Sequence, residues 1–468
     1  MKIPRILLAA GASGSGKTLI TCGILQALVN QGLKVASFKC GPDYIDPMFH
    51  QQVIGTKASN LDTFFTSRER TKYLLGVNAA DCDMAVMEGV MGYYDGVGGT
   101  TTWASAYDLA DATGTPVILI VNSKGMSLSL MAYLKGFLEY RENSHIKGVI
   151  FNQMSPMLYP RMKALAEELG VQVLGYVPVV ADCVIESRHL GLVLPEDVPE
   201  LKNRLRALAK ILEETLDMEA ILRLASGASE LEMLEDLTGE DETFAYRTPE
   251  TVRIGVADDE AFCFFYKDNF RLLEKMGAEL VRFSPIHDKE LPENLDGLLL
   301  YGGYPELKAQ KLSENQSMRQ AIFQTLQQGM PCMAECGGFM YLHEEMEDMD
   351  GNSWPMVGTV QGKAYRTKKL GRFGYITLER SGHTLGPIPA HEFHYFDSTN
   401  CGEAFQAKKP ESGREWKCMH AKGRIQAGFP HLYYYGNPRV PKQFLENCLA
   451  YRKECAGQKY QQNKECKR

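Results

Sequence analysis

The segment Gly11–Thr18, which reads GASGSGKT, constrains the fold more than any other part of this sequence. It matches the pattern G-x-x-x-x-G-K-[ST], and it lies between an apolar run, Arg5–Ala10, and an amphipathic stretch, Thr18–Asn30. In this strand–loop–helix context, backbone N–H groups and the helix N-terminus can surround phosphate oxygens. Lys17 would reach the β- and γ-phosphates, and Thr18 would hold Mg²⁺. The alternative is a glycine turn without a ligand. The loop glycines that we expect to shape the site are Gly11, Gly14 and Gly16.

Short β-rich runs alternate with helical stretches along residues 1–215, which predicts a parallel sheet covered on both faces. An acidic segment at 216–249 reads as a linker, and a second α/β domain follows at 250–450. The lysine- and glutamine-rich residues 451–468 read as a flexible tail. We therefore predict two doubly wound α/β domains. Beyond the first strand, the strands we expect are Lys34–Lys39, Met84–Met87, Val117–Val121, Gly148–Phe151, Arg253–Ala257, Gly297–Tyr301 and Pro331–Ala334.

Composition and net charge restrict the classes of partner that we expect the chain to bind. The 468 residues carry a net charge of −7, which disfavours nucleic-acid binding driven by overall charge. No apolar run approaches the roughly 18 residues that span a bilayer, so we expect no membrane partner. The twelve cysteines form no Cys-x-x-Cys pair, and no export signal is recognisable. We therefore expect a cytoplasmic protein with reduced thiols.

Acidic residues follow two of the predicted strands in the first domain. The second strand leads into KCGPDYIDP, in which Lys39 is accompanied by Asp43 and Asp46. The strand at Met84–Met87 ends at Glu88, and Asp95 follows on a glycine-rich loop. An acid at the end of an apolar strand commonly helps to hold Mg²⁺ beside a phosphate site. The three aspartates could equally stabilise turns.

Cys336 is the candidate nucleophile of the second domain. It lies in AECGGF, between a predicted strand and a predicted helix at Phe339–Glu347, which is the arrangement of a nucleophile elbow with Cys in place of Ser. The N–H of Gly337 and a group in the loop Tyr301–Glu306 would bind an oxyanion, and the helix N-terminus would lower the thiol pKa. A buried structural cysteine is the alternative. Spacing alone does not choose the base among His343, His383, His391, His394, His420 and His431.

Together these residues resemble the cobyrinate a,c-diamide synthase family, whose members join a dethiobiotin-synthetase-like P-loop ATPase domain to a class I glutamine amidotransferase domain with a flavodoxin-like fold. The resemblance covers nearly the whole chain. It rests on the P-loop and on KCGPDYIDPMFH at Lys39–His50, EGVMG from Glu88 followed by Asp95-Gly96, ESRHLGLV at Glu186–Val193, GGYPE at Gly302–Glu306, ECGGFM at Glu335–Met340, HEFHY at His391–Tyr395, and His431.

The resemblance implies a role for each matching residue. Cys336 is the implied nucleophile and His431 its base, with Gly303 and Gly337 at the oxyanion. MgATP would be held by Lys17, Lys39 and the P-loop glycines, with Thr18, Asp43 and Glu88 at the metal, while Asp46 and Asp95 are further active-site acids. Many class I amidotransferases carry a glutamate two residues after the histidine, where this chain has Tyr433, so another group must orient His431.

The family implies a ligase that amidates the a- and c-acetate groups of a cobyrinate-type tetrapyrrole, with ATP and L-glutamine as the other substrates. Because ammonia has to reach the activated carboxylate before it becomes solvated ammonium, we hypothesise a protected path for it between the domains. Nickel-sirohydrochlorin and hydrogenobyrinate are alternative substrates, and the sequence leaves a homodimer open. A P-loop ATPase acting as a switch is the alternative of a different class, but it leaves the Cys336 elbow without a use.

Overall fold

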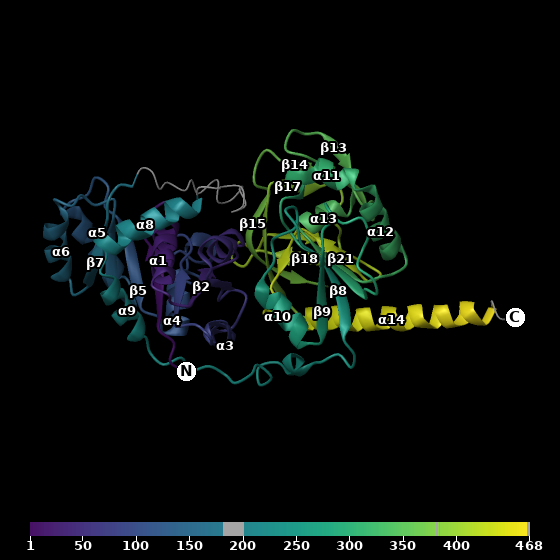
Figure 1. The fold of residues 1–468 in the computed structure, drawn as a ribbon, viewed down its shortest axis with the longest axis horizontal. Coiled ribbons are helices and arrows are strands. Elements are labelled where there is room, and N and C mark those ends of the chain that lie inside the picture. Colours follow the sequence, from purple (N-terminus) through teal and green to yellow (C-terminus); the bar gives the residue numbers. More distant parts are fainter. Residues whose placement is uncertain (181–200, 381, 383, 466–468) are drawn as a thin grey trace. The chain divides into compact units, whose positions relative to one another are not determined.

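A computed structural model describes residues 1–180, 201–380, 382 and 384–465, the side chains of 458–465 excepted. The chain divides into two compact units, Met1–Asp236 and Leu237–Arg468 (Figure 1). The motif at 186–193 and His383 lie outside the described residues.

Among the described residues, the first unit is built on a seven-stranded parallel sheet in the order β3-β2-β4-β1-β5-β6-β7. This confirms the predicted parallel α/β fold. The apolar central strands were recognisable from sequence, whereas the edge strands β3 and β7 were not predicted. The strands are β1 (Arg5–Ala10), β2 (Val35–Cys40), β3 (Lys57–Leu61), β4 (Met84–Glu88), β5 (Val117–Asn122), β6 (Ile146–Asn152) and β7 (Gln172–Val177).

Apolar side chains of α1, α8 and α9 form one core with side chains of the central strands. Helix α1 follows the P-loop directly, so this packing fixes the loop against the sheet. The helices of the unit are α1 (Lys17–Asn30), α2 (Ile45–Phe49), α3 (Arg68–Ala79), α4 (Ala106–Thr113), α5 (Ser129–Glu139), α6 (Tyr159–Glu167), α8 (Leu201–Thr215) and α9 (Met218–Ser226).

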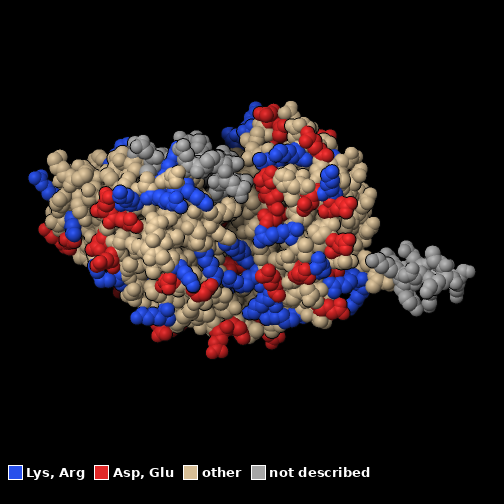
Figure 2. All heavy atoms as spheres, viewed as in Figure 1, with Lys and Arg blue, Asp and Glu red and all other residues tan. Residues whose placement is uncertain are grey.

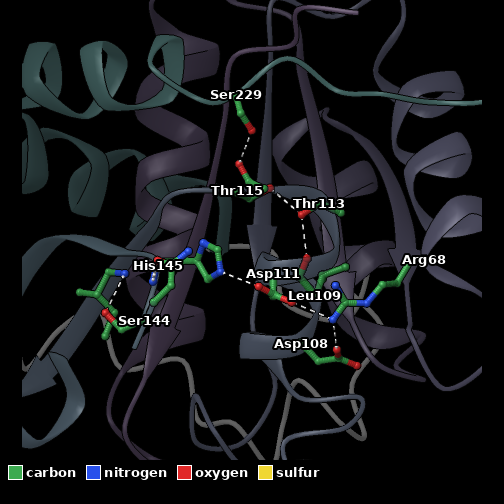
Figure 3. A network of polar contacts seen from close by, with 12 residues as sticks. Arg68, Asp108, Leu109, Asp111, Thr113, Thr115, Ser144, His145 and Ser229 are labelled. Carbon is green, nitrogen blue, oxygen red and sulfur yellow. Dashed lines mark hydrogen bonds and ion pairs between the residues drawn. The ribbon is translucent and has the colours of Figure 1, made fainter. Parts of the chain in front are cut away.

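The first unit extends past the predicted domain end at 215. Helix α9 buries Ile221 in the same core as α1 and α8. Further on, Ser229 bonds the segment between α4 and β5, where its hydroxyl donates to the Gly114 carbonyl at 3.2 Å (Figure 3). Its own carbonyl accepts a hydrogen bond at 2.8 Å from the buried Arg5 of β1. The expectation of a solvated linker over 216–249 therefore needs correction, because its first part is core structure.

The second unit begins before residue 250. Phe244 is buried, and its ring stacks on Tyr435 with centroids 5.8 Å apart. At the other end, α14 (Arg439–Glu465) continues through the predicted tail. Tyr451 is buried, and the Arg452 Nε donates to Asp296 at 2.8 Å. The predicted start of the flexible tail, at residue 451, is therefore too early, because contacts hold the helix to the unit at least as far as Arg452.

In the described part of the second unit, the central sheet has six strands in the order β20-β21-β11-β10-β8-β9. All its pairs are parallel except β20 with β21. The carboxyl ends of β10 and β11 are therefore neighbours, which brings the GGYPE loop to the Cys336 elbow. The strands are β8 (Val252–Ala257), β9 (Ala278–Phe283), β10 (Gly297–Leu300), β11 (Cys332–Glu335), β20 (His420–Lys422) and β21 (Ile425–Gly428).

Two smaller sheets, in the orders β13-β12-β14-β17 and β19-β18-β15-β16-β22, complete the strands of this unit that the structure describes. In the second of them, His391 and His431 are directly paired. The strands are β12 (His343–Glu347), β13 (Ser353–Pro355), β14 (Val360–Arg366), β15 (Arg372–Glu379), β16 (Ile388–His394), β17 (Phe396–Ser398), β18 (Phe405–Lys408), β19 (Glu415–Cys418) and β22 (His431–Leu432).

The helix predicted at Phe339–Glu347 is wrong over most of its length. Helix α13 covers only Gly337–Tyr341, and residues from His343 onward form β12. His343 and Met346 are buried while Glu344 and Glu345 are exposed, so this short segment has neither a clear helical nor a clear strand periodicity. The other helices of the unit are α10 (Lys267–Lys275), α11 (Ala309–Glu314) and α12 (Gln316–Gln327).

Basic and acidic side chains are interspersed on the face drawn in Figure 2. Among the described residues, no helix combines the length and the apolar character needed to cross a bilayer.

Candidate functional site

The P-loop lies between β1 and α1, as predicted. Gly16 precedes the helix with φ at 86°, in the region that favours glycine. A Cβ at this position would run into the amide of Asn152, which donates to the Ser15 carbonyl at 2.8 Å. Asn152 ends β6, so a neighbouring strand holds the loop. Conformation and space therefore both require glycine at 16.

A buried charged cluster lies beside this loop and contains four of the predicted residues. The Thr18 hydroxyl donates to Glu88 Oε1 at 2.6 Å. Lys39 Nζ donates to the same oxygen at 2.9 Å and lies 2.5 Å from Asp46 Oδ2. Because β2 and β4 are adjacent and pair Lys39 with Glu88, the sheet register produces this meeting. The cluster also includes His50, whose Nε2 lies 3.5 Å from Glu88 Oε2 and which the sequence analysis did not select.

Burial and neighbouring charges shift the pKa values in this cluster. Burial raises the pKa of Asp46 to about 7, against the opposing effect of Lys39. Burial alone would also raise the pKa of Glu88, but Lys39 and His50 hold it below its ordinary value. Glu88 is therefore an anion at neutral pH, as a metal-binding carboxylate must be.

Lys17 is mostly buried, and its Nζ donates to the Met91 carbonyl at 2.9 Å. Burial, and then Lys39, lower the pKa of Lys17 to about 8. A phosphate at the P-loop would raise this pKa again and so stabilise the charged form of the ammonium group.

Asp43 and Asp95 both support backbone turns. Asp43 Oδ1 accepts from the backbone N–H groups of Ile45 at 2.8 Å and Asp46 at 3.2 Å, at the start of α2. Asp95 Oδ2 accepts from the Gly92 N–H at 3.0 Å. The structure therefore keeps these two carboxylates outside the hydrogen-bonded group around Glu88, and their proposed direct roles stay predictions.

The residues around Glu88 fit Mg²⁺ bound together with nucleotide. Glu88 is fully buried, and among the described residues its Oε2 accepts no hydrogen bond, while His50 Nε2 lies 3.5 Å from it. Within the described ranges, no three acidic, His or Cys side chains converge as a self-sufficient metal site. Mg²⁺ usually takes one or two carboxylates plus substrate phosphates, so a single anionic acid beside the Thr18 hydroxyl is a suitable donor set.

Cys336 occupies the predicted elbow in the second unit. It stands between β11 and α13 with φ 47° and ψ −104°, which is a strained conformation for a residue other than glycine. Its backbone N–H is held by the Gly428 carbonyl at 2.8 Å. Sharp, strained turns of this type present a nucleophile at the edge of a sheet.

The predicted partners of Cys336 meet around two glycines of the GGYPE loop. A Cβ built on Gly302 would lie 2.6 Å from His431 Cε1 and 3.5 Å from Cys336 Cβ. The imidazole and the thiol side chain therefore flank the same glycine. A Cβ built on Gly337 would lie 3.2 Å from the Gly303 nitrogen, so the two predicted oxyanion donors are also neighbours.

The expected lowering of the thiol pKa is not found. Burial, and then the charge of Glu306, raise the pKa of Cys336 above its ordinary value. Helix α13 has only five residues, and a hydrogen bond from Gly337 offsets only part of the burial effect. The thiol is therefore protonated in this structure and needs a base when it reacts.

His431 is the histidine that the structure places beside the thiol. Burial lowers its pKa to about 3, so the imidazole is neutral and can accept a proton. Its ring stacks on His391, with centroids 4.9 Å apart and planes 17° apart. By contrast, His343 bonds Phe339 and Ser398 and is a satisfied core residue.

The carboxyl group of Glu335 lies beside His431, a contact that the sequence analysis did not identify. Its Oε2 lies 3.8 Å from His431 Nδ1 and accepts from the Leu432 N–H at 3.3 Å. Tyr433, two residues after His431, donates its hydroxyl instead to Asp268 at 2.9 Å. The only available sequence signal for Glu335 was an acid directly before the nucleophile.

Comparison with known proteins gives a family for each half of the chain. Residues 6–192 match the CobQ/CobB/MinD/ParA nucleotide binding domain, and residues 253–437 match the CobB/CobQ-like glutamine amidotransferase domain. The cobyrinate a,c-diamide synthase of Caldanaerobacter subterraneus subsp. tengcongensis is 36% identical over 96% of this chain and 99% of its own. The one of Listeria innocua is 37% identical over 94% and 98%.

The chain belongs to the cobyrinate a,c-diamide synthase family. This confirms the family and the type of enzyme predicted from the sequence, a ligase with a nucleotide-binding domain and a glutamine amidotransferase domain. A solved structure titled "Crystal structure of glutamine amidotransferase" is 19% identical over 42% of this chain and 98% of its own, with a TM-score of 0.32.

As a cobyrinate a,c-diamide synthase family member, the protein keeps its two sets of chemical groups in separate units. The P-loop and the Glu88 cluster lie in the first unit, and Cys336 with His431 lies in the second. Each set falls within the corresponding matched domain.

Proposed function

We propose that this protein amidates the a- and c-acetate carboxylates of cobyrinate in turn, with ATP as the activating substrate and L-glutamine as the nitrogen donor. The proposal rests on the presence of both sets of groups in one chain. Cys336 and His431 flank Gly302, and Gly303 lies beside Gly337. The same chain holds the hydrogen-bonded cluster of Thr18, Glu88 and Lys39. The near full-length similarity to proteins named cobyrinate a,c-diamide synthase supports the choice of substrate.

The first unit would activate the carboxylate. A carboxylate resists attack by ammonia because its negative charge deactivates the carbonyl carbon. A carboxylate oxygen therefore attacks the γ-phosphorus of ATP, the bond to the β-phosphate oxygen breaks, and an acyl phosphate and ADP form. Lys17 and Lys39 would neutralise charge on the phosphates, while Thr18 and Glu88 would hold Mg²⁺, which supplies further charge neutralisation.

The second unit would release ammonia. His431 takes the Cys336 proton as the sulfur attacks the amide carbon of glutamine, and the N–H groups at Gly303 and Gly337 bind the oxyanion. The carbon–nitrogen bond breaks, His431 returns the proton to the leaving nitrogen, and a thioester remains. Water hydrolyses the thioester to glutamate. The ammonia attacks the acyl phosphate, phosphate leaves, and a carboxamide is formed.

Two substitutions test this division of labour. We expect Cys336→Ala to reduce glutamine-dependent amidation by about 10³-fold or more while ammonia-dependent amidation survives. Lys17→Ala should abolish amidation from either nitrogen source, because it blocks carboxylate activation. The measurement is product mass with MgATP and cobyrinate, and parallel assays with nickel-sirohydrochlorin and hydrogenobyrinate decide the macrocycle. Loss of both activities in Cys336→Ala would contradict separate sites, and ATP hydrolysis without glutamate release would favour an ATPase switch.

A further inference from the structure

A cavity of about 620 Å³ in the first unit lies beside the P-loop and is used by none of the steps above. Gly11, Asp95, Tyr140 and Arg141 are among the residues that line it. Its volume falls within the range of small-molecule sites, about 300–1,000 Å³. The cavity therefore has the size and position to hold part of a substrate next to the phosphate-binding loop.

One wall of the cavity is an aromatic stripe along α5 and its C-terminal cap, Tyr140. Tyr133, Phe137 and Tyr140 follow one another at intervals of four and three residues, so they share a helix face. The core-facing side chains of α5 are different ones, Leu130, Met131 and Leu134. The stripe is turned away from the core, and Tyr140 is 63% exposed, so the stripe offers aromatic surface to a ligand.

The aromatic wall is held in place from the loop that follows Glu88. The Tyr94 hydroxyl donates to the Phe137 carbonyl at 2.7 Å, and the two rings stack with centroids 5.7 Å apart. Gly136 lines the same wall, and a Cβ there would meet nothing within 4 Å, so the space in front of it is open. Contacts within the chain therefore fix the position of this wall, and the space in front of Gly136 is open.

The two ends of the aromatic stripe have different neighbours. The Tyr133 hydroxyl packs directly against Gly11, the first residue of the P-loop, which places one end of the stripe at the phosphate site. Near the other end, the exposed Arg141 lies over the Tyr140 ring, 5.1 Å from its centroid. Arg141 forms no hydrogen bond or ion pair within the described part of the chain. Such a guanidinium group is suited to a carboxylate.

We infer that this aromatic pocket binds the tetrapyrrole substrate, with its ring against Tyr133, Phe137 and Tyr140 and one of its carboxylate arms on Arg141. This inference rests on the proposed function and adds the residues that recognise the macrocycle. A ligand seated there would direct another acid arm past Gly11 toward the γ-phosphate. The aromatic faces fit a flat, largely apolar ring, and the cation fits the acid groups on its rim.

Binding of cobyrinate to the full-length protein tests the inference. We expect Arg141→Gln and Tyr140→Ala each to raise the Kd for cobyrinate about 10-fold in equilibrium dialysis, while the Kd for ATP stays unchanged. The matched control is Arg161→Gln on α6, an exposed arginine outside the pocket, which should leave both constants unchanged.

Three results would overturn the inference. An unchanged Kd for cobyrinate in both pocket variants would show that the ring binds elsewhere. An equal loss of ATP affinity would assign the pocket to the nucleotide. A changed oligomeric state with normal cobyrinate affinity would assign the aromatic stripe to a second copy of the chain. Failure of the unsubstituted protein to amidate cobyrinate would instead contradict the proposed function, so the two failures are distinguishable.

Discussion

At the scale of single residues, the environment of His431 decides how the buried thiol can react. Cys336 is protonated because burial raises its pKa, and in the reaction that we propose neutral His431 receives the proton. The imidazolium that results would be costly in a buried place unless a negative charge lies nearby. Glu335, 3.8 Å from Nδ1, supplies that charge when its carboxyl group is ionised, and because burial raises its pKa to about 8, the ionised fraction grows as pH rises toward 8.

We therefore expect Glu335→Gln to lower kcat for glutamine hydrolysis by about 10- to 100-fold with little change in KM. Glutamine keeps the acceptor for the Leu432 N–H but cannot carry the negative charge. Steady-state glutaminase kinetics over a range of pH measure the effect, and ammonia-dependent amidation is the internal control. An unchanged kcat with an unchanged pH profile would show that Glu335 only supports the fold.

Glu335 should also make stability depend on pH. Burial raises its pKa to about 8, above the roughly 4.3 of an exposed glutamate. A raised pKa means that the folded state holds the proton more tightly than the unfolded state. The associated stability is complete below about pH 4.3 and is lost as pH rises toward 8, with a slope of up to about 1.4 kcal/mol per pH unit.

Because glutamine does not titrate, Glu335→Gln should remove the loss of folding stability that occurs as pH rises toward 8. The Tm of the variant minus that of the unsubstituted protein should be more positive at pH 8 than at pH 5, as measured by differential scanning calorimetry. A difference that is equal at both pH values would mean that Glu335 does not hold a proton in the folded state near neutral pH.

At the scale of elements, the sequence predicted the helices and strands whose conformation is specified by their own local pattern. The strand ending at Ala10, the P-loop and the helix from Lys17 are contiguous in sequence, so their order was readable. The edge strand Lys57–Leu61, KASNL, has little apolar character, and β12 has no clear periodicity. Such segments take their conformation from pairing with distant strands, which local pattern does not show.

The same reasoning explains which residues of the candidate site could be selected from the sequence. Cys336 lies in a local motif and could be selected directly, and a family resemblance selected His431. Neither source identified Glu335 as a neighbour of His431, because that contact depends on how β11 and β22 meet in space. His50 was missed for a similar reason, since its contact with Glu88 joins two segments far apart in sequence.

Helix α9 provides a test of the corrected domain boundary. Ile221 is fully buried in the core that holds α1, so Ile221→Ala should destabilise the first unit by about 2–5 kcal/mol. The matched control on the same helix is Glu219→Ala, whose exposed side chain should change stability by about 0.5 kcal/mol or less. Urea unfolding of the full chain measures both, and equal midpoints for the two variants would contradict the assignment of α9 to the core.

At the scale of the whole molecule, the two reactions have to be linked by ammonia. At neutral pH most free ammonia becomes ammonium, which is not a nucleophile, so we proposed a protected path within one chain. The variants Cys336→Ala and Lys17→Ala allow a direct test, because each should retain the half-reaction that the other lacks.

We expect an equimolar mixture of the two variants to show little glutamine-dependent amidation at pH 7, although glutamate is released and the synthetase half accepts added ammonia. Raising the pH to about 9.5 should restore product, since released ammonia then stays unprotonated in solution. Product mass and glutamate release, followed together, measure the coupling. If the mixture at pH 7 recovered about half of the activity of the unsubstituted protein, ammonia would be passing freely through solvent and the protected path would be excluded.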